Sequence, residues 1–270
     1  MTELHPPQVN LWQEMGDTET RVAVRPDHAF HFHCHPGLQC FNRCCREATL
    51  VLSPYDILRL SRRLSLSTGE FIKRHTRRED EAGSGLPLVL ARPPRTGGCP
   101  FLAAAGCTVY ADRPAACRLF PMAQGSELTP AGVVDHFFLR RLDYCQGFAG
   151  KPAWTAASWQ DDQGFHEFDQ PRRPWLRLLL REAAAGIPRD DRLLTQFYLM
   201  AYDLDAFRHY VFESAFLKVN GLTPEEAAPL RTDDQALLRF SAAFFEQLLF
   251  PEEAPSLQEA LAKVSGGEGR

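Results

Sequence analysis

The chain has 270 residues, of which 44% are hydrophobic and 24% charged, a composition typical of a folded globular protein that excludes wholesale disorder. Its 30 lysines and arginines and 34 acidic residues give a formal net charge of −4, which argues against a strongly basic nucleic-acid-binding protein. No apolar run approaches the ~20 residues that cross a bilayer, so we expect no membrane partner.

Composition divides the chain into four predicted segments. Residues 1–27 are a polar lead-in, residues 28–150 contain every cysteine, residues 151–252 carry mainly helix signals, and residues 253–270 form a C-terminal tail. The start of the chain lacks the apolar stretch of a secretory signal, so we expect the cytoplasm as its compartment. We predict an α+β protein, in which a small irregular cysteine-rich domain with short antiparallel strands precedes a mostly helical region.

Short strands and helices are predicted within the cysteine-bearing half. Residues 48–52, 86–90 and 133–139 are predicted strands, because each is a short run of mainly apolar residues. One helix is predicted to begin after Ser53, which suits the N-cap because Pro54 and Asp56 follow it. A second helix is predicted after Ser67, the first residue of a capping-box pattern. The acidic stretch 79–85 is predicted to be an exposed loop.

Helical spacing dominates the C-terminal half. One helix is predicted after Pro174, and the apolar residues between 197 and 211 continue with helical spacing. Thr223 begins another predicted helix, and Thr232 opens a further one that Pro251 ends. We expect this region to cover the cysteine site or to bind a protein partner.

The cysteines are unevenly distributed, because all eight lie between residues 34 and 145 and four lie within twelve residues. They are Cys34, Cys40, Cys44, Cys45, Cys99, Cys107, Cys117 and Cys145. In a reducing compartment, clustered cysteines are more often metal ligands than disulfides. Thiolates are soft ligands that suit zinc and iron–sulfur clusters, so we interpret all eight as candidate metal ligands. They suffice for two four-cysteine sites, or for one site with bystanders.

Cys44 and Cys45 are adjacent, which makes them awkward as two ligands of one tetrahedral ion. Successive side chains tend to diverge, so we expect these two to face different ways. They then serve two different centres, or one of them is buried and inert. The spacings also exclude several known sites, because the chain has no C-x2-C pair of the kind used by zinc ribbons and thioredoxin-like redox sites.

The segments around these cysteines resemble the YkgJ-type cysteine-cluster family, described as putative zinc- or iron-chelating domains. Besides the first four cysteines, the resemblance rests on the segments 98–102 (GCPFL), 106–110 (GCTVY) and 113–121 (RPAACRLFP), and on Cys145. It covers roughly residues 30–150 and implies that the cysteines bind a metal ion or a cluster. The sequence is also distantly similar to the flagellin lysine N-methylases, which are associated with an iron–sulfur centre.

Charged residues near the cysteines have candidate roles. Arg113 and Arg118 flank Cys117, and we predict that they contact the bound cofactor, since guanidinium groups offset thiolate charge. His31, His33 and His35 alternate around Cys34, and we expect them on a solvated edge rather than as ligands. The acidic residues Asp203, Asp205, Asp233 and Asp234 are expected at helix starts.

The sequence therefore predicts a metal-binding protein that holds an iron–sulfur cluster, or alternatively a zinc or iron ion, through clustered thiolates. An iron–sulfur cluster is preferred, since eight cysteines exceed the four that one structural zinc needs. One alternative is a cluster-dependent protein-modifying enzyme similar to the lysine N-methylases, although the chain has no glycine-rich loop after a convincing strand to bind S-adenosylmethionine. Another alternative is a metal carrier or sensor.

Overall fold

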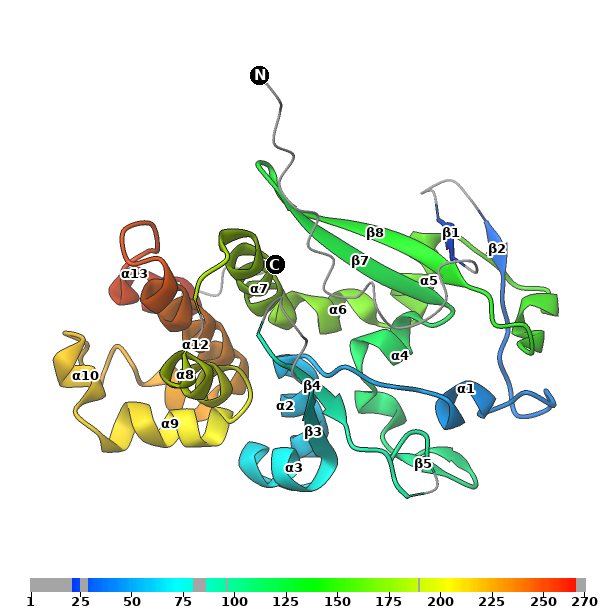
Figure 1. Ribbon diagram of the computed structural model, residues 1–270, viewed down its shortest axis with the longest axis horizontal. Helices are drawn as coiled ribbons and strands as arrows, with labels where there is room; N and C mark the ends of the chain where they lie inside the picture. The colour runs from blue at the N-terminus through cyan, green and yellow to red at the C-terminus, as the bar shows by residue number, and fades with distance from the viewer. Residues whose placement is uncertain (1–20, 25–28, 80–85, 96, 189, 266–270) are drawn as a thin grey trace. The chain divides into compact units, whose positions relative to one another are not determined.

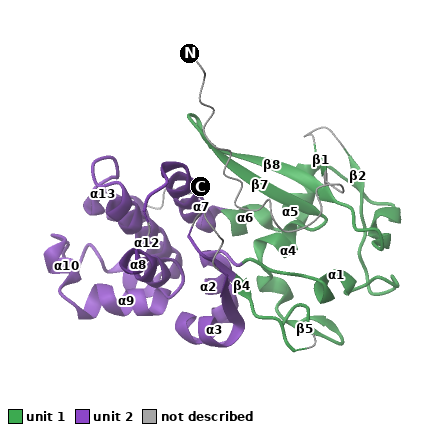
Figure 2. Ribbon diagram, in the orientation of Figure 1, with its two compact units in different colours: residues 1–51, 90–169 green, residues 52–89, 170–270 purple. Residues whose placement is uncertain are grey.

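The computed structural model describes residues 21–24, 29–79, 86–95, 97–188 and 190–265 (Figure 1). The chain folds into two compact units (Figure 2). Unit 1 comprises residues 1–51 and 90–169, and unit 2 comprises residues 52–89 and 170–270. Short antiparallel strands in the first half and helices in the second confirm the predicted α+β class. Residues 52–89 pack with the C-terminal helices in unit 2.

Unit 1 is built on one three-stranded sheet and two small two-stranded pairs. Its strands are β1 (Arg21–Ala23), β2 (Phe30–His31), β5 (Leu102–Ala103), β6 (Gly106–Cys107), β7 (Met122–Thr129), β8 (Gly132–Arg140) and β9 (Ala153–Trp154). The sheet has the antiparallel order β1-β8-β7, while β2 pairs with β9 and β5 with β6. Strand β8 confirms the predicted strand 133–139. Strand β1 lies in the predicted lead-in, where it pairs Val22 with Leu139.

The helices of unit 1 are short. They are α1 (Arg43–Arg46), η2 (Tyr110–Asp112), α4 (Ala115–Leu119), η3 (Gln146–Ala149), α5 (Ala156–Asp162) and α6 (Phe165–Asp169). Helices α4, α5 and α6 contact one another, and α4 also contacts β7 (Figure 1). The buried Phe32 ring packs edge-on against the rings of Phe120, Phe148 and Trp159, with centroids 5.2–5.8 Å apart. This aromatic cluster fixes the strand that leads into Cys34.

Unit 2 combines one strand pair with most of the helices. Its elements are α2 (Pro54–Arg63), α3 (Thr68–His75), β3 (Thr76–Glu79), β4 (Leu88–Ala91, which ends in unit 1), η4 (Gln170–Arg172), α7 (Arg173–Ala185), α8 (Asp191–Ala201), α9 (Leu204–Glu213), α10 (Phe216–Val219), α11 (Pro229–Thr232), α12 (Asp234–Leu249) and α13 (Leu257–Ser265). Helices α2 and α3 begin where predicted, each with a complete capping box, at Ser53 with Asp56 and at Ser67 with Glu70.

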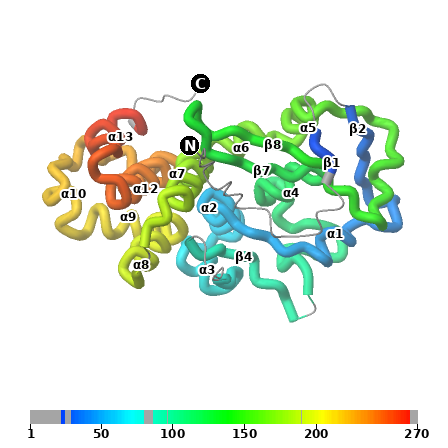
Figure 3. Tube along the Cα trace, turned by 45° about the horizontal axis from the view of Figure 1, so that its top comes forward, coloured from blue at the N-terminus to red at the C-terminus, as the bar shows by residue number. Residues whose placement is uncertain are grey.

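Helix α12 is central to unit 2, because it contacts α2, α7, α8, α9, α11 and α13 (Figure 3). It contributes the fully buried Phe240 and Phe245. The Phe245 ring lies 5.8 Å from that of Trp175 on α7 and 5.7 Å from that of Phe197 on α8. Burial of such large aromatic side chains, at about 25 cal/mol per Å² of apolar surface, gives unit 2 its own hydrophobic core.

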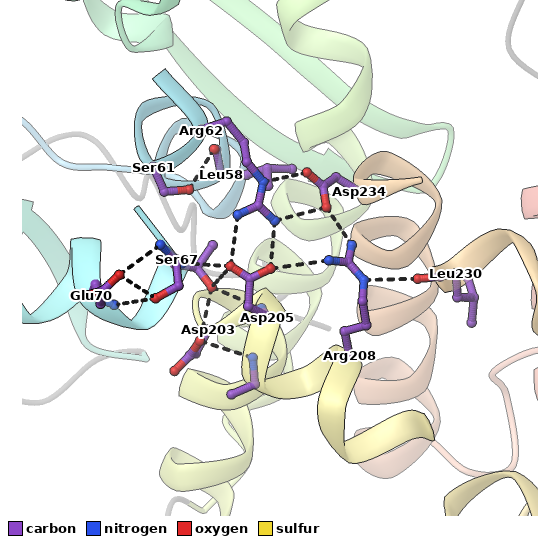
Figure 4. A network of polar contacts seen from close by, with 12 residues as sticks. Leu58, Ser61, Arg62, Ser67, Glu70, Asp203, Asp205, Arg208, Leu230 and Asp234 are labelled. Carbon is purple, nitrogen blue, oxygen red and sulfur yellow. Dashed lines mark hydrogen bonds and ion pairs between the residues drawn. The ribbon is translucent and has the colours of Figure 1, made fainter. Parts of the chain in front are cut away.

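An ion-pair network joins α2, α9 and α12 (Figure 4). The guanidinium group of Arg62 donates to both carboxylate oxygens of Asp205, at 2.7 and 2.9 Å, and to both of Asp234, at 2.7 and 3.0 Å. Arg208 bridges the same two carboxylates from the other side and also donates to the Leu230 carbonyl. The backbone N–H of Thr68 donates to Asp205 as well, which ties α3 into the network.

Several predicted elements differ from the structure. Residues 48–52 contribute an isolated bridge between Val51 and Leu90 in place of a strand, because the chain enters α2 two residues later. The helical spacing of 197–211 is divided between α8 and α9, since Asp203 caps the second helix. Thr223 makes capping contacts with Glu226, but the next helix starts only at Pro229, whose missing N–H prevents an earlier start.

Part of the predicted tail is helical, and part of the predicted acidic loop is not described by the structure. Helix α13 lies within the predicted tail 253–270, because Leu257, Ala260 and Leu261 are buried and α13 packs on α12. Residues 80–85 of the predicted loop lie outside the described residues. Across the described part of the chain, none of the helices has both the length and the apolar character needed to cross a membrane.

Candidate metal centre

All eight cysteines belong to unit 1 and are free thiols. Cys34 is exposed and the other seven are partly buried. Cys34 follows β2, Cys40 precedes α1, Cys44 and Cys45 lie on α1, Cys99 precedes β5, Cys107 is in β6, Cys117 is in α4, and Cys145 precedes η3. Short irregular elements thus collect thiols that are up to 111 residues apart in the sequence.

Four of these thiols form the first thiol group, which comprises Cys34, Cys40, Cys44 and Cys145. Partial desolvation of its sulfur and the charges of the three others raise the pKa of the Cys34 thiol to about 11. Burial also raises the pKa of Cys145, together with the charges of Cys40 and Cys44. Side-chain hydrogen bonding with Cys40 adds a smaller rise. The four thiols therefore influence one another's pKa values.

Backbone pairing brings the two ends of this group together. The N–H of His33 donates to the Gly147 carbonyl at 2.9 Å, next to the β2–β9 pair. A Cβ atom on Gly147 would lie 2.6 Å from the Phe32 ring, so glycine permits the close approach. The N–H of Gln146 donates to the Cys40 sulfur at 3.3 Å. Cys34, Cys40 and Cys145 therefore meet because segments 30–34 and 145–154 run side by side.

Three residues that were not predicted from the sequence connect the segment before Cys145 to helix α1. They are Arg43, Glu47 and Tyr144. Arg43 donates to Glu47 at 3.0 Å, and its guanidinium carbon lies 3.9 Å from the centre of the Tyr144 ring. Burial and the hydrogen bond that Tyr144 donates to Glu47 raise the pKa of Tyr144 to about 12. The i, i+4 spacing of Arg43 and Glu47 around Cys44 was visible in the sequence. The contact with Tyr144 was not, because it joins residues about a hundred positions apart.

The remaining four thiols form the second thiol group, which comprises Cys45, Cys99, Cys107 and Cys117. A hydrogen bond with Cys44, burial, and the charges of Cys44, Cys117 and Cys99 all raise the pKa of Cys45. Burial raises the pKa of Cys99, and the charge of Cys107 adds to this. Within the described residues, Cys45 is therefore the member of α1 that faces the later cysteines.

The second group depends on a close backbone approach. The N–H of Cys99 donates to the Cys45 carbonyl at 2.8 Å. Gly98 has φ +82°, and a Cβ atom there would lie 2.6 Å from the Arg46 carbonyl oxygen. Glycine therefore permits both the turn and the contact with α1. The β5–β6 pair then places Cys107 opposite Leu102, three residues after Cys99.

The adjacent Cys44 and Cys45 join the two groups through a hydrogen bond between their side chains. The Cys45 thiol donates to the Cys44 sulfur, and this lowers the pKa of Cys44 to about 7, with help from backbone N–H groups. Successive side chains on a helix point about 100° apart. This divergence explains how the neighbours of Cys44 and those of Cys45 come to be different cysteines.

Backbone N–H groups already donate to several sulfurs. Phe101 donates to Cys99 at 3.4 Å and Gln146 donates to Cys40 at 3.3 Å. Cys145 accepts a further bond from Gly147. Such N–H···S bonds stabilise thiolates, and they are among the features that tune cysteine-bound metal centres.

Arg113 and Arg118 are buried and hold the Cys117 segment in place. Arg113 donates to the Tyr110 carbonyl at 2.8 Å and to the Gln163 side chain at 2.7 Å. Arg118 donates to the Gln163 carbonyl at 3.0 Å and to the Ala111 carbonyl, and it lies over the Phe168 ring. These contacts connect η2 and α4 with residues 163–168. The predicted contact of the two guanidinium groups with a cofactor stays a prediction.

The three histidines around Cys34 contact protein groups. His31 hydrogen-bonds the Lys151 carbonyl at 3.0 Å, and His35 accepts from the N–H of Gly37 at 3.2 Å. The rings of His33 and His35 lie 4.8 Å apart.

The donor set fits a thiophilic metal in its chemistry, because eight free thiols gather in one unit. Among the described residues, no three His, Cys, Asp or Glu side chains are arranged so that they could hold a metal ion as they stand. Binding therefore requires the thiols to close further and to lose protons, since thiolates are the ligating form.

Comparison with known protein families found a match for part of the chain. Residues 33–146 match a family model, CxxCxxCC, described as a putative zinc- or iron-chelating domain. No curated protein and no solved structure matches the chain. In that pattern two residues separate the first three cysteines and the last two are adjacent. Here Cys44 and Cys45 are also adjacent, but five residues separate Cys34 from Cys40 and three separate Cys40 from Cys44. The match confirms the predicted resemblance of this segment to the cysteine-cluster family.

Proposed function

We propose that residues 28–150 bind iron in an iron–sulfur centre through the eight cysteine thiolates, with a zinc or iron ion as the alternative occupant. The observation that carries this proposal is the gathering of all eight free thiols in unit 1. The family description, a zinc- or iron-chelating domain, agrees with it.

The number and surroundings of the thiols favour a cluster over one structural zinc. One zinc ion needs four ligands, and eight thiols are present. Backbone N–H groups donate to Cys40, Cys99 and Cys145, and hydrogen bonds of this kind lower the negative charge on cluster thiolates.

The test is anaerobic purification, followed by an absorption spectrum and by iron, zinc and acid-labile sulfide analysis on one sample. We expect a broad band near ~400 nm together with matching amounts of iron and sulfide. A colourless protein with stoichiometric zinc would replace the cluster by a zinc site. Absence of any bound metal, even after reconstitution with iron, sulfide or zinc, would refute the proposed function.

A second candidate, a metal carrier or sensor, is favoured by the exposure of the thiols. Cys34 is exposed and the other seven thiols are only partly buried, so a bound metal would be within reach of a partner or a chelator. Loss of metal to a mild chelator within minutes would support this role. Retention for hours would argue for a structural or catalytic centre.

We also infer a reducing compartment such as the cytoplasm. Eight neighbouring thiols would oxidise readily elsewhere, and all eight are free. Expression in an oxidising compartment should therefore yield disulfide-linked species without bound metal, detectable by mass spectrometry.

A further inference from the structure

We propose that the eight thiols form two separate four-cysteine metal centres, one in the first thiol group (Cys34, Cys40, Cys44 and Cys145) and one in the second (Cys45, Cys99, Cys107 and Cys117). This inference rests on the proposed metal-binding function. It adds how many centres the unit holds and which cysteines share each one. The boundary between the centres falls between two adjacent residues, Cys44 and Cys45.

Each group is the right size for one centre. Four thiolates complete the tetrahedral shell of zinc, and four also ligate the four irons of a [4Fe–4S] cluster, one each. Neither group draws its members from one continuous segment. The first takes them from residues 34–44 and 145, and the second from residues 45, 99–107 and 117. A metal in the first group would connect two separate segments of unit 1, and a metal in the second would connect three.

Different backbone contacts hold the two groups. In the first, His33 donates to the Gly147 carbonyl at 2.9 Å and Gln146 donates to the Cys40 sulfur at 3.3 Å. In the second, Cys99 donates to the Cys45 carbonyl at 2.8 Å. The first depends on strand β2 and the loop before η3, whereas the second depends on Gly98 and the β5–β6 pair. Either group can therefore form through contacts that the other does not use.

Helix α1 contributes one ligand to each group, and this explains the adjacent cysteines. Cys44 is next to the Arg43–Glu47–Tyr144 contacts, which fasten the Cys145 loop to α1. Cys45 accepts the N–H of Cys99 at its carbonyl, at 2.8 Å, and the charges of Cys117 and Cys99 act on its thiol. The two thiols also share a hydrogen bond, which metal binding would break because both sulfurs must be deprotonated.

The test compares three double variants that each lose two cysteines, so that the number of remaining thiols is matched. Two are confined to one group, Cys40→Ala with Cys145→Ala, and Cys99→Ala with Cys107→Ala. The third crosses the groups, Cys40→Ala with Cys107→Ala. The full chain, reduced and anaerobic, is titrated with cobalt(II) alone, because cobalt takes tetrahedral thiolate sites and its thiolate charge-transfer absorption reports them.

We expect the wild-type chain to saturate with two cobalt ions, and each group-confined variant with one that keeps a four-thiolate spectrum. The crossed variant should show no four-thiolate spectrum, although it has as many thiols as the group-confined variants. A wild-type chain that saturates with one ion, or a crossed variant that keeps a four-thiolate site, would overturn the partition and leave metal binding intact. No thiolate absorption in the wild-type chain would instead overturn the proposed function.

A second measurement needs no variant and so avoids misfolding. The wild-type chain is loaded with one equivalent of cobalt(II), alkylated briefly, and the protected cysteines of each molecule are read by mass spectrometry. In each molecule, the protected cysteines should be the four of the first thiol group or the four of the second. Molecules in which Cys44 and Cys45 are protected together with only two further cysteines would overturn the partition.

Discussion

Two neighbouring glycines before Cys99 share a backbone conformation but not their surroundings. Gly97 and Gly98 have φ values of +81° and +82°. A Cβ atom on Gly97 would have open space, whereas one on Gly98 would lie 2.6 Å from the carbonyl oxygen and 2.8 Å from the Cα of Arg46. Backbone atoms cannot move aside as a flexible side chain can. Comparing substitutions at the two positions therefore distinguishes the cost of the left-handed conformation from the cost of the collision with α1.

We therefore expect Gly97→Ala and Gly98→Ala to differ. Both pay the left-handed strain of roughly 1–2 kcal/mol. Gly98→Ala should cost about 1–3 kcal/mol more through the collision with Arg46, and it should separate Cys99 from Cys45. Urea unfolding and cobalt(II) binding measure the two effects. Equal stability and equal cobalt binding of the two variants would show that the approach of Gly98 to α1 is unimportant.

At the scale of elements, the ion pairs on the helices of unit 2 differ in how many carboxylates each arginine contacts and in how exposed these are. Arg62 donates to two carboxylates on two other helices, and the side chains of Asp205 and Asp234 are only 27% and 29% exposed. Arg74 pairs with Glu70 within one helix, and both side chains are more than half exposed. The Arg62 network should therefore contribute to stability, whereas the exposed pair should contribute little.

Replacing each arginine by methionine, which keeps much of the aliphatic stem, tests this difference. Arg62→Met should lower the free energy of unfolding by about 1–2 kcal/mol, because it leaves two partly buried carboxylates with fewer donors. Arg74→Met should change it by less than about 0.5 kcal/mol. Chemical denaturation of both variants in the same buffer gives the comparison, and equal losses would contradict it.

The same network predicts an acid dependence. Burial raises the pKa of Asp205, but hydrogen bonds from Arg62 and the Thr68 N–H and the nearby guanidinium charges outweigh this and lower it to about 2. An unfolded aspartate has a pKa of about 3.9, so the unfolded chain takes up the proton first as pH falls. This contribution to stability is therefore complete above about pH 4 and is lost between about pH 4 and 2.

Unfolding free energies between pH 5 and 2 measure this loss. In Asp205→Asn the decline with falling pH should be shallower, because the group that titrates is gone. Some decline should remain, since hydrogen bonds from the arginines also lower the pKa of Asp234 against the effect of its burial. An unchanged slope would show that Asp205 does not carry the effect.

Local signals explain which elements the sequence could predict. Helices α2 and α3 begin at capping boxes, whose hydrogen bonds span three residues, and both starts were predicted correctly. The division of residues 197–211 into two helices was missed, because the apolar spacing continues across the break. The Asp203 cap that restarts the helix also bonds Thr68, which lies 135 residues away in the sequence.

At the scale of the whole molecule, the two units should respond differently to metal removal. All the cysteines lie in unit 1, whereas unit 2 has its own aromatic core around Phe245. Since metal binding contributes free energy to the folded state of the unit that binds it, we expect chelation to destabilise unit 1 selectively.

Hydrogen exchange with and without a chelator measures this difference. Amides of β7 and β8 in unit 1 should exchange at least about tenfold faster after metal removal, the change that corresponds to ~1.4 kcal/mol of lost stability. Amides of α12 in unit 2 should change little. Equal acceleration in both units would show that the chain unfolds as a single cooperative body.

The sequence by itself determined the fold class, the starts of α2 and α3, and the donor chemistry. These depend on residue types and on spacings of a few positions, such as Ser53 with Asp56 or the run from Cys40 to Cys45. The expectation that Cys44 and Cys45 face different ways also followed from local geometry alone. Only the tertiary structure decided which cysteines are neighbours. Cys145 meets Cys40 because backbone pairs join residues 32–33 to 147–152, and Cys99 meets Cys45 because Gly98 fits against Arg46. Contacts between such distant residues depend on how whole segments pack, and spacing along one chain does not encode that packing.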